Sequence, residues 1–248
     1  MNIHRTACVI VVSLYTHVSS GQDTLRNTSL SFRAGVGVLY MKDEFQSPYT
    51  YSGTNPLIGL TGVMNRSRGS HNLDLSFSWG KIQSIVSPKA NTATLSVHYD
   101  YLVQLTNPDK QKRLVFSAGL GLHSVTNRST YLPNIELPVY SISSTAFMSA
   151  SAQVHYALNK KSQLMAQASL PIAGIVYRPD FEVDGKSLLK FTSPTSSQLF
   201  YFKATYAHRL RPRLHFIATY DYSYFSTDEP RSLTFLNQGL TIGLRKTF

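Results

Sequence analysis

Residues 232–248, SLTFLNQGLTIGLRKTF, form the last stretch of the chain, and their pattern decides the fold. Read in steps of two, one side of the stretch is apolar and carries Leu236, Leu240, Ile242, Leu244 and Phe248. The other side is small or polar and carries Asn237, Gly239, Thr241, Gly243, Arg245 and Thr247. Successive side chains of a β-strand point to opposite faces. The stretch therefore predicts a two-faced strand that ends on an aromatic residue.

The same alternation recurs along most of the chain. It predicts nine further strands, at 30–41, 57–64, 72–82, 93–105, 113–123, 145–158, 163–177, 198–208 and 214–225. The last of these alternates most cleanly, whereas 57–64 alternates poorly. Pro171 cannot donate a hydrogen bond to a neighbouring strand, so it predicts a bulge within 163–177. The sequence thus predicts an all-β protein with ten strands.

The connections between these segments are unequal in a regular way. Those after the second, fourth, sixth and eighth segments are short and polar: 65–70, 106–112, 159–161 and 209–213. Three of the others are long and rich in turn-forming residues: 42–56, 126–144 and 178–195. This alternation predicts antiparallel strands with tight turns at one end and longer loops at the other. The role of the long loops stays open.

The composition agrees with a barrel that has one face in lipid. Charged residues make up 15% of the chain, whereas a soluble domain is nearer a quarter charged. Tyr and Phe number 15 and 13, while hydrophobic residues reach only 42%. A secreted soluble sandwich is the alternative, and it needs a packed core opposite a polar face. Here the face opposite the apolar one is rich in Gly, Ser, Gln and His, which is too polar for such a core.

The closing stretch and the unequal connections resemble outer-membrane β-barrel proteins of Gram-negative bacteria, which have short periplasmic turns and long external loops. Their terminal targeting signal runs polar–x–Gly–x–x–apolar–x–aromatic. Thr241, Gly243 and Phe248 fit this signal, whereas Lys246 stands where an apolar residue is usual. No motif narrows the resemblance to a subfamily.

The resemblance implies an antiparallel up-and-down transmembrane barrel, with ten strands by the segment count and twelve or eight as alternatives. It implies a location in the outer membrane with both termini in the periplasm. The expected partners are outer-membrane lipid and the barrel-assembly machinery, for which Gly243 and Phe248 are the predicted assembly signal.

The first residues form a separate unit and predict a cleavable signal peptide over 1–21. Residues 7–15, ACVIVVSLY, are an apolar run too short for a transmembrane helix, and small residues follow it. Residues 22–248 then form a single barrel domain. The only cysteine, Cys8, precedes the expected cleavage site, so the mature chain needs no disulfide.

The charges divide between the two kinds of connection. The predicted outer loops hold most of the acids: Asp43, Glu44, Glu136, Asp180, Glu182, Asp184, Asp228 and Glu229. The predicted inner turns hold basic residues: Arg66, Arg68, Lys110, Lys112, Arg113, Lys160, Lys161, Arg209, Arg211 and Arg213. Such a rim could attract anionic headgroups or an acidic periplasmic partner, although simple hydration of turns is the plainer interpretation. Secretion and the lack of a concentrated basic face exclude nucleic acid as a partner.

The polar face predicts a network of side chains inside the barrel: Arg33, Asp74, His98, Asp100, His155, Lys203, His215, Asp221 and Arg245. Charges in so confined a space must be paired or hydrogen-bonded, and a small barrel is filled by its side chains. His98 and Asp100 share a face and are expected to interact. The set has no nucleophile signature and no paired ligand spacing, so no catalytic, cofactor-binding or metal site is predicted. Some local room is predicted beside the closing strand by Gly35, Gly37, Gly239 and Gly243.

These features predict a non-enzymatic barrel with two open roles. One is a subunit of an envelope or secretion assembly, which would bring other envelope proteins as partners, and the other is a narrow pore. Two alternatives belong to other classes: a barrel-embedded hydrolase or protease, and an adhesin or receptor that binds through its loops. The fold does not choose among them.

Overall fold

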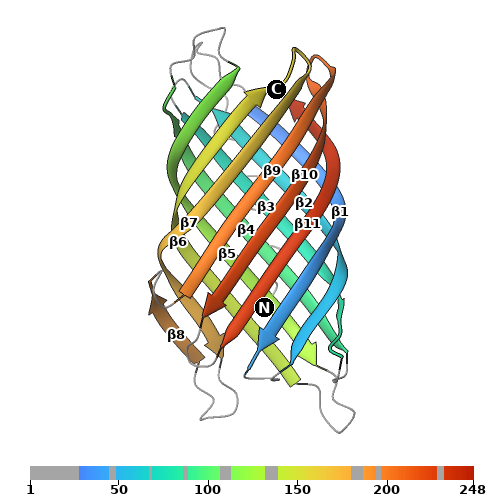
Figure 1. The fold of residues 1–248 in the computed structure, drawn as a ribbon, viewed down its shortest axis with the longest axis vertical. Helices are drawn as coiled ribbons and strands as arrows, with labels where there is room; N and C mark the ends of the chain where they lie inside the picture. Colours follow the sequence, from blue (N-terminus) through green and yellow to red (C-terminus); the bar gives the residue numbers. More distant parts are fainter. Residues whose placement is uncertain are drawn as a thin grey trace.

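A computed structural model describes residues 28–44, 49–66, 69–85, 89–106, 113–131, 139–179, 187–193, 197–227 and 232–248. These residues form a closed antiparallel barrel (Figure 1). Its strands are β1 (Thr28–Asp43), β2 (Thr50–Asn65), β3 (Gly69–Ile82), β4 (Ala90–Gln104), β5 (Leu114–Tyr131), β6 (Val139–Ala157), β7 (Ser162–Pro179), β9 (Ser197–Arg211), β10 (Leu214–Thr227) and β11 (Leu233–Thr247). A short strand, β8 (Ser187–Thr192), pairs with the end of β7. The predicted signal peptide, 1–21, lies outside the described residues.

The barrel closes where its first and last strands meet. Each of the ten barrel strands pairs with the next barrel strand along the chain, and β11 pairs with β1 from Thr247 opposite Ser29 to Leu233 opposite Asp43. The prediction of ten barrel strands is confirmed, and the stretch that ends the chain is the closing strand.

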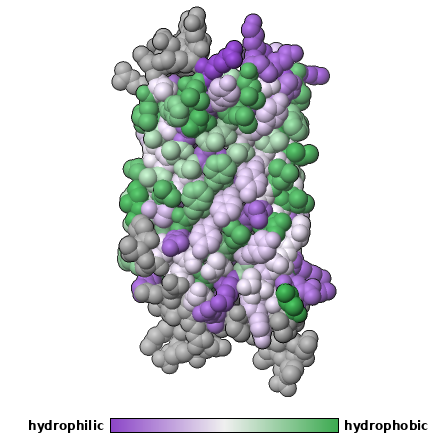
Figure 2. All heavy atoms as spheres, viewed as in Figure 1, coloured by the Kyte–Doolittle hydropathy of each residue, from purple (hydrophilic) through white to green (hydrophobic). Residues whose placement is uncertain are grey.

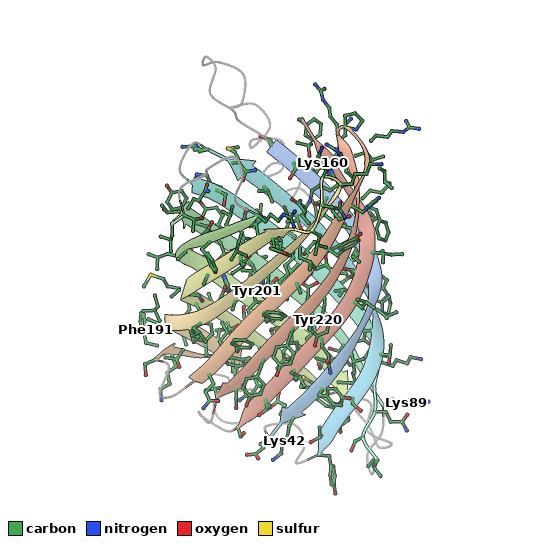
Figure 3. The ribbon with its side chains drawn as sticks, turned by 45° about the horizontal axis from the view of Figure 1, so that its top comes forward. Lys42, Lys89, Lys160, Phe191, Tyr201 and Tyr220 are labelled. Atoms are coloured by element: carbon green, nitrogen blue, oxygen red, sulfur yellow. The ribbon has the colours of Figure 1, made fainter. Side chains whose placement is uncertain are left out.

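The barrel has two unlike ends. At one end, called the turn end here, lie the short connections after β2, β4, β6 and β9. Both ends of the described chain meet there, because the Phe248 N–H donates to the Thr28 carbonyl at 2.8 Å. The other connections lie at the opposite end, called the loop end. Lys160 marks the turn end, whereas Lys42 and Lys89 mark the loop end (Figure 3).

Apolar side chains face outward over most of the barrel wall, as the alternation predicts. Phe32, Leu122 and Leu240 are 59%, 62% and 59% exposed, although each belongs to a strand that is paired on both sides. Hydrophobic residues cover much of the visible wall and hydrophilic ones gather toward the turn end (Figure 2). No helix in the described ranges is long and apolar enough to cross a membrane.

The strands are longer than predicted at the loop end. Most of the predicted loop 42–56 belongs to β1 and β2, and most of 126–144 belongs to β5 and β6. The turn-forming residues Gly53, Asn55 and Pro56 lie within β2. Their composition pointed to a loop, but the paired neighbouring strands hold them in extended conformation. The third predicted loop, 178–195, contains β8, which was not predicted.

The predicted bulge at Pro171 is confirmed. Ser149 lies opposite Pro171 and Met148 lies opposite Ala173, so Ile172 is the extra residue on β7. The pairing of β7 with β9 runs only from Ser162 to Ser169 on β7, and beyond the bulge β7 pairs with β8 instead. The bulge thus marks the point where β7 changes partner.

Candidate functional site

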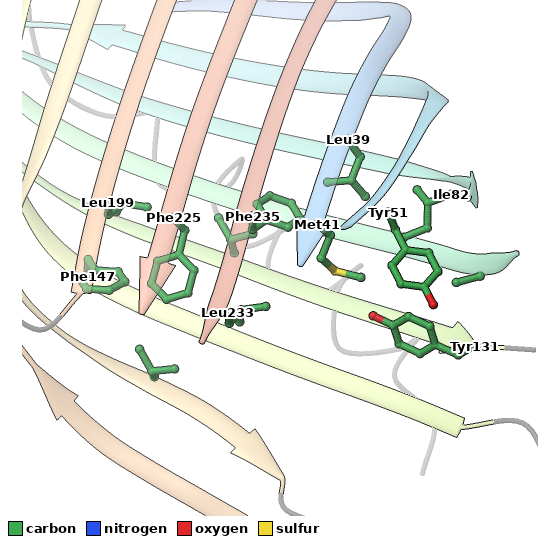
Figure 4. Packing of buried hydrophobic residues seen from close by; sticks show 13 residues of the cluster. Leu39, Met41, Tyr51, Ile82, Tyr131, Phe147, Leu199, Phe225, Leu233 and Phe235 are labelled. Atoms are coloured by element: carbon green, nitrogen blue, oxygen red, sulfur yellow. The ribbon is translucent and has the colours of Figure 1, made fainter. Parts of the chain in front are cut away.

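The inward side chains fill the loop end of the lumen with an apolar plug. Its members are Leu39, Met41, Tyr51, Ile82, Ala90, Val125, Tyr131, Phe147, Val176, Leu199, Phe225, Leu233 and Phe235, all buried. They come from opposite sides of the barrel and meet inside it (Figure 4). The rings of Tyr51 and Tyr131 meet edge to face at 5.1 Å, and those of Phe147 and Phe225 lie 5.9 Å apart. Such edge-to-face and tilted rings pack closely in the interior of a protein.

One buried ion pair lies beside the plug. The Arg178 guanidinium binds the Asp43 carboxylate, and the Ser141 hydroxyl donates to the same carboxylate at 2.7 Å. Because β1, β6 and β7 supply these residues, the pair links distant strands across the lumen. Asp43 was predicted to lie in an outer loop, but it is the last residue of β1 and points inward.

A second layer, the ionic belt, crosses the middle of the lumen. The Arg33 guanidinium donates to Asp74 at 2.7 Å and to Asp221 at 3.1 Å. The Lys203 ammonium also binds Asp74, so two cations and two carboxylates balance one another. Arg33 is 2% exposed, and such a buried charge is tolerated only with partners of this kind. Arg33, Asp74, Lys203 and Asp221, all members of the predicted lumen network, are thus in contact with one another.

Gly59 makes room for the belt. A Cβ at this position would collide with the Arg33 guanidinium. By contrast, a Cβ at Gly62, on the same strand, would meet nothing within 4 Å. The absence of a side chain at Gly59 therefore allows the Arg33 guanidinium to occupy its position in the belt.

A hydrogen-bonded cluster around Asp100 adjoins the belt. His123 Nε2 lies 3.0 Å from the Asp100 carboxylate, which also accepts from Ser151 at 2.5 Å and Gln167 at 2.8 Å. The His98 ring stacks on His123 at 4.7 Å rather than hydrogen-bonding Asp100. The partner expected for Asp100 from the sequence was His98, but the neighbouring strand places His123 closer. Ser151 donates to a carboxylate and not to a histidine, so the cluster lacks the arrangement that activates a serine nucleophile.

The third layer, at the turn end, is a cavity that we call the vestibule. Its volume is about 280 Å³. It extends from Asp74 and Asp100 to Ser29, Asn65 and Thr247, which lie at strand termini. Five further residues of the predicted network line it: His98, His155, Lys203, His215 and Arg245. The vestibule thus leads from the turn end inward and stops at the belt.

Arg245 differs from the other lumen cations. Its Nε donates to the Ser31 hydroxyl at 3.2 Å, and no carboxylate of the described chain lies within 4.0 Å of it. His155 Nε2 lies 2.8 Å from the Gln153 side-chain oxygen, so it too faces an uncharged partner. Arg245 is therefore held in the lumen by a hydrogen bond to a neutral side chain, unlike the paired cations of the belt.

The room expected beside the closing strand is partly filled. The Leu57 side chain lies over Gly37 and Gly239, where a Cβ would meet it. Gly35 and Gly243 lie against the backbone of the strand that each pairs with. These glycines permit close packing of β1, β2 and β11 rather than forming a groove.

Several lumen residues were missed in the predicted network. Tyr51 and Tyr131 of the plug were missed because they stand in segments that composition assigns to loops, whereas other plug residues, such as Leu39 and Phe147, stand in predicted strands but were not assigned to the lumen network. Period-two alternation carried into 42–56 and 126–144 would have placed Tyr51 and Tyr131 on the inward face. No group of His, Cys, Asp and Glu that could hold a metal occurs in the part of the chain that the structure describes. Phe248 ends β11 half-exposed to the outside and Gly243 lies within that strand, and their role as an assembly signal stays a prediction.

Comparison with solved structures identifies the architecture. The barrel is similar to the outer membrane protease OmpT from Escherichia coli, with a TM-score of 0.61 and 9% identity over 93% of this chain and 99% of that one. The chain therefore has the fold of outer-membrane β-barrel proteins. The translocator domain of the autotransporter NalP from Neisseria meningitidis matches this chain at a TM-score of 0.45 and 10% identity, over 98% and 95% of the two chains. No protein-family model and no curated protein matches the sequence.

Proposed function

We propose that this outer-membrane β-barrel is a non-enzymatic, non-conducting subunit of an envelope assembly, with both termini in the periplasm. The observation that carries the proposal is the occluded lumen. The plug and the ionic belt lie at two successive levels of the lumen, and both are made of buried, mutually contacting side chains. A barrel that conducts no solute can still bind other proteins through its rims and its outer wall, which is the role of an assembly subunit.

The same layers argue against a pore. Ten strands make a barrel slightly wider than the eight-stranded size whose interior side chains just fill it. Here the inward positions hold long or aromatic residues at two levels, and the vestibule stops at the belt. A permeating ion would have to displace paired charges and then cross the buried rings of the plug.

Conductance measurements test the closed lumen directly. Purified protein in planar bilayers is expected to show no steady current, beside a general porin prepared in the same detergent as a positive control. Removing belt charge alone, as in Arg33→Ser, is expected to leave the barrel closed because the plug remains. A large steady current from the unmodified protein would overturn the proposal and favour the narrow pore.

The assembly role needs a separate measurement. Blue-native electrophoresis of membranes extracted in mild detergent is expected to show a species larger than the purified chain. Dissociation in harsh detergent should return the barrel to the mobility of the purified chain. Identical mobility before and after dissociation counts against an assembly.

The alternative of a hydrolase has weaker support. The Asp100 carboxylate already accepts from His123, Ser151 and Gln167, so it holds a network in place rather than facing a reacting group. The likeness to a protease is one of fold at 9% identity. We expect no cleavage of peptide substrates by the purified barrel, and cleavage that is lost in Asp100→Asn would refute the non-enzymatic role.

A further inference from the structure

Arg245 and Arg33 are both cations inside the lumen, but their partners differ. Arg33 binds two carboxylates. Arg245 has one uncharged partner, Ser31, and its guanidinium lines the vestibule. A partly buried cation without a counter-charge is costly, because it loses hydration that no carboxylate replaces. The vestibule therefore contains a charge that a bound anion would neutralise.

The carboxylates nearest the vestibule are already engaged. Asp74 binds both Arg33 and Lys203, and Asp100 accepts three hydrogen bonds within its cluster. The remaining lining near Arg245 includes His155 and His215, which carry no negative charge. With about 280 Å³ of space, the cavity can admit a carboxylate together with a short chain segment.

The rim around the vestibule is strongly basic. Exposed cations of the described turn end are Arg66, Arg113, Lys160, Lys161, Arg209, Arg211, Arg213 and Lys246. No described residue of this rim has an acidic side chain, and the terminal carboxylate of the chain is its single acid. Clustered cations of one sign attract acidic partners and raise their local concentration at the mouth. Exposed cations thus surround the turn end of the lumen, and Arg245 lies further in, on the wall of the vestibule.

We propose that the vestibule is a socket for an acidic peptide segment of a partner protein on the turn side of the membrane, with a carboxylate of that segment bound by Arg245. The inference rests on the proposed assembly role. A lipid headgroup fits less well, because lipid surrounds the outer wall, whereas Arg245 faces the lumen. A free small anion would use the socket but would gain little from the rim, which extends well beyond the cavity.

Peptide binding to the full chain in zwitterionic detergent tests the socket. The probe is a fluorescent hexaglutamate peptide, with a hexaglutamine peptide of the same length as the neutral control. Arg245→Gln and Arg113→Gln each remove one positive charge, but only the first alters the vestibule. We expect Arg245→Gln to weaken binding by at least about tenfold, as loss of a charged hydrogen bond does, and Arg113→Gln to weaken it by less than about threefold.

A second measurement does not depend on a variant that folds. A benzophenone group on the hexaglutamate peptide is expected to attach to vestibule residues such as Met165, as mapped by mass spectrometry. Attachment confined to the rim overturns the socket. Equal weakening by the two substitutions also overturns it, because general attraction to the rim then explains the binding.

Competition separates the sources of the anion. Free glutamate, inorganic phosphate and phosphatidylglycerol vesicles are each expected to compete poorly with the peptide. If free glutamate or phosphate displaces the peptide with an affinity equal to that of the peptide, the vestibule is a site for small anions. If the vesicles displace it, the rim is a surface that binds lipid. If blue-native gels show a larger species but the peptide does not bind, only the socket is refuted. If the peptide binds but the gels show no larger species, only the assembly role is refuted.

Discussion

The two ends of the lumen are built from the same strands but are filled in opposite ways. In β1 the inward positions near the turn end are Ser29, Ser31 and Arg33, whereas near the loop end they are Leu39 and Met41. The outward face is apolar at both levels. Alternation therefore tells which residues point inward, but the chemistry of those residues decides whether each level of the lumen is dry or hydrated.

The difference also sets how each level supports the fold. The plug stabilises the barrel by burying apolar surface, which gains free energy without needing an exact partner. The belt is stable only while each charge keeps its counter-charge. The vestibule leaves Arg245 with one neutral hydrogen bond and is expected to contribute little. Substitutions at the three levels should therefore have graded effects on the free energy of unfolding.

The largest effect is expected in the plug. Phe147→Ala and Phe225→Ala should each lower the free energy of unfolding by about 3–5 kcal/mol, because each leaves a cavity among closely packed rings. Urea unfolding in detergent micelles, followed by tryptophan fluorescence, measures the change. Phe32→Ala is the matched control, since Phe32 is 59% exposed on the outer wall. An equal loss in the control would show that the plug has no special part in stability.

The belt should respond according to its pairing. Arg33→Met should cost about 3–5 kcal/mol, because it leaves the part-buried Asp221 with only the Tyr201 hydroxyl as partner. The double variant Arg33→Met/Asp221→Leu restores the charge balance and should recover part of this loss. A double variant as unstable as the single one would show that packing rather than charge pairing is responsible.

Alternation from the sequence placed the barrel strands, the closing strand and the bulge at Pro171. It also placed the belt residues on the inward face, because each lies two or four positions from other polar residues of the same strand. It could not predict that Asp100 pairs with His123, since the stagger between β4 and β5 decides that contact. Tyr51 and Tyr131 of the plug were missed for another reason. Residues such as Gly53 and Pro56 favour turns locally, and only pairing with the adjacent strands extends them.

A smaller effect is expected where the backbone makes room for the belt. Gly59→Ala should cost about 1–3 kcal/mol, because its Cβ would push the Arg33 guanidinium away from its carboxylates. Gly62→Ala, where a Cβ meets nothing, should leave the free energy of unfolding nearly unchanged. The heat-modifiable mobility of the two variants on unboiled gels gives a first comparison, and urea titration gives the magnitude. The reverse ranking would mean that Arg33 can move at little cost.

The smallest effect on stability is expected at Arg245, although it too is a lumen cation. Arg245→Gln should change the free energy of unfolding by less than about 1 kcal/mol, because the single hydrogen bond to Ser31 is lost while an unpaired charge is also removed. The contrast with Arg33→Met then isolates the effect of pairing, since both changes remove one positive charge from the lumen.

Hexaglutamate peptide sharpens the contrast further. A ligand that binds only the folded state stabilises it in proportion to the logarithm of its concentration over Kd. The peptide should therefore raise the urea midpoint of the unmodified protein and leave that of Arg245→Gln unchanged. If Arg245→Gln is as unstable as Arg33→Met without peptide, Arg245 is a structural residue and the turn end of the lumen is no different in kind from its middle.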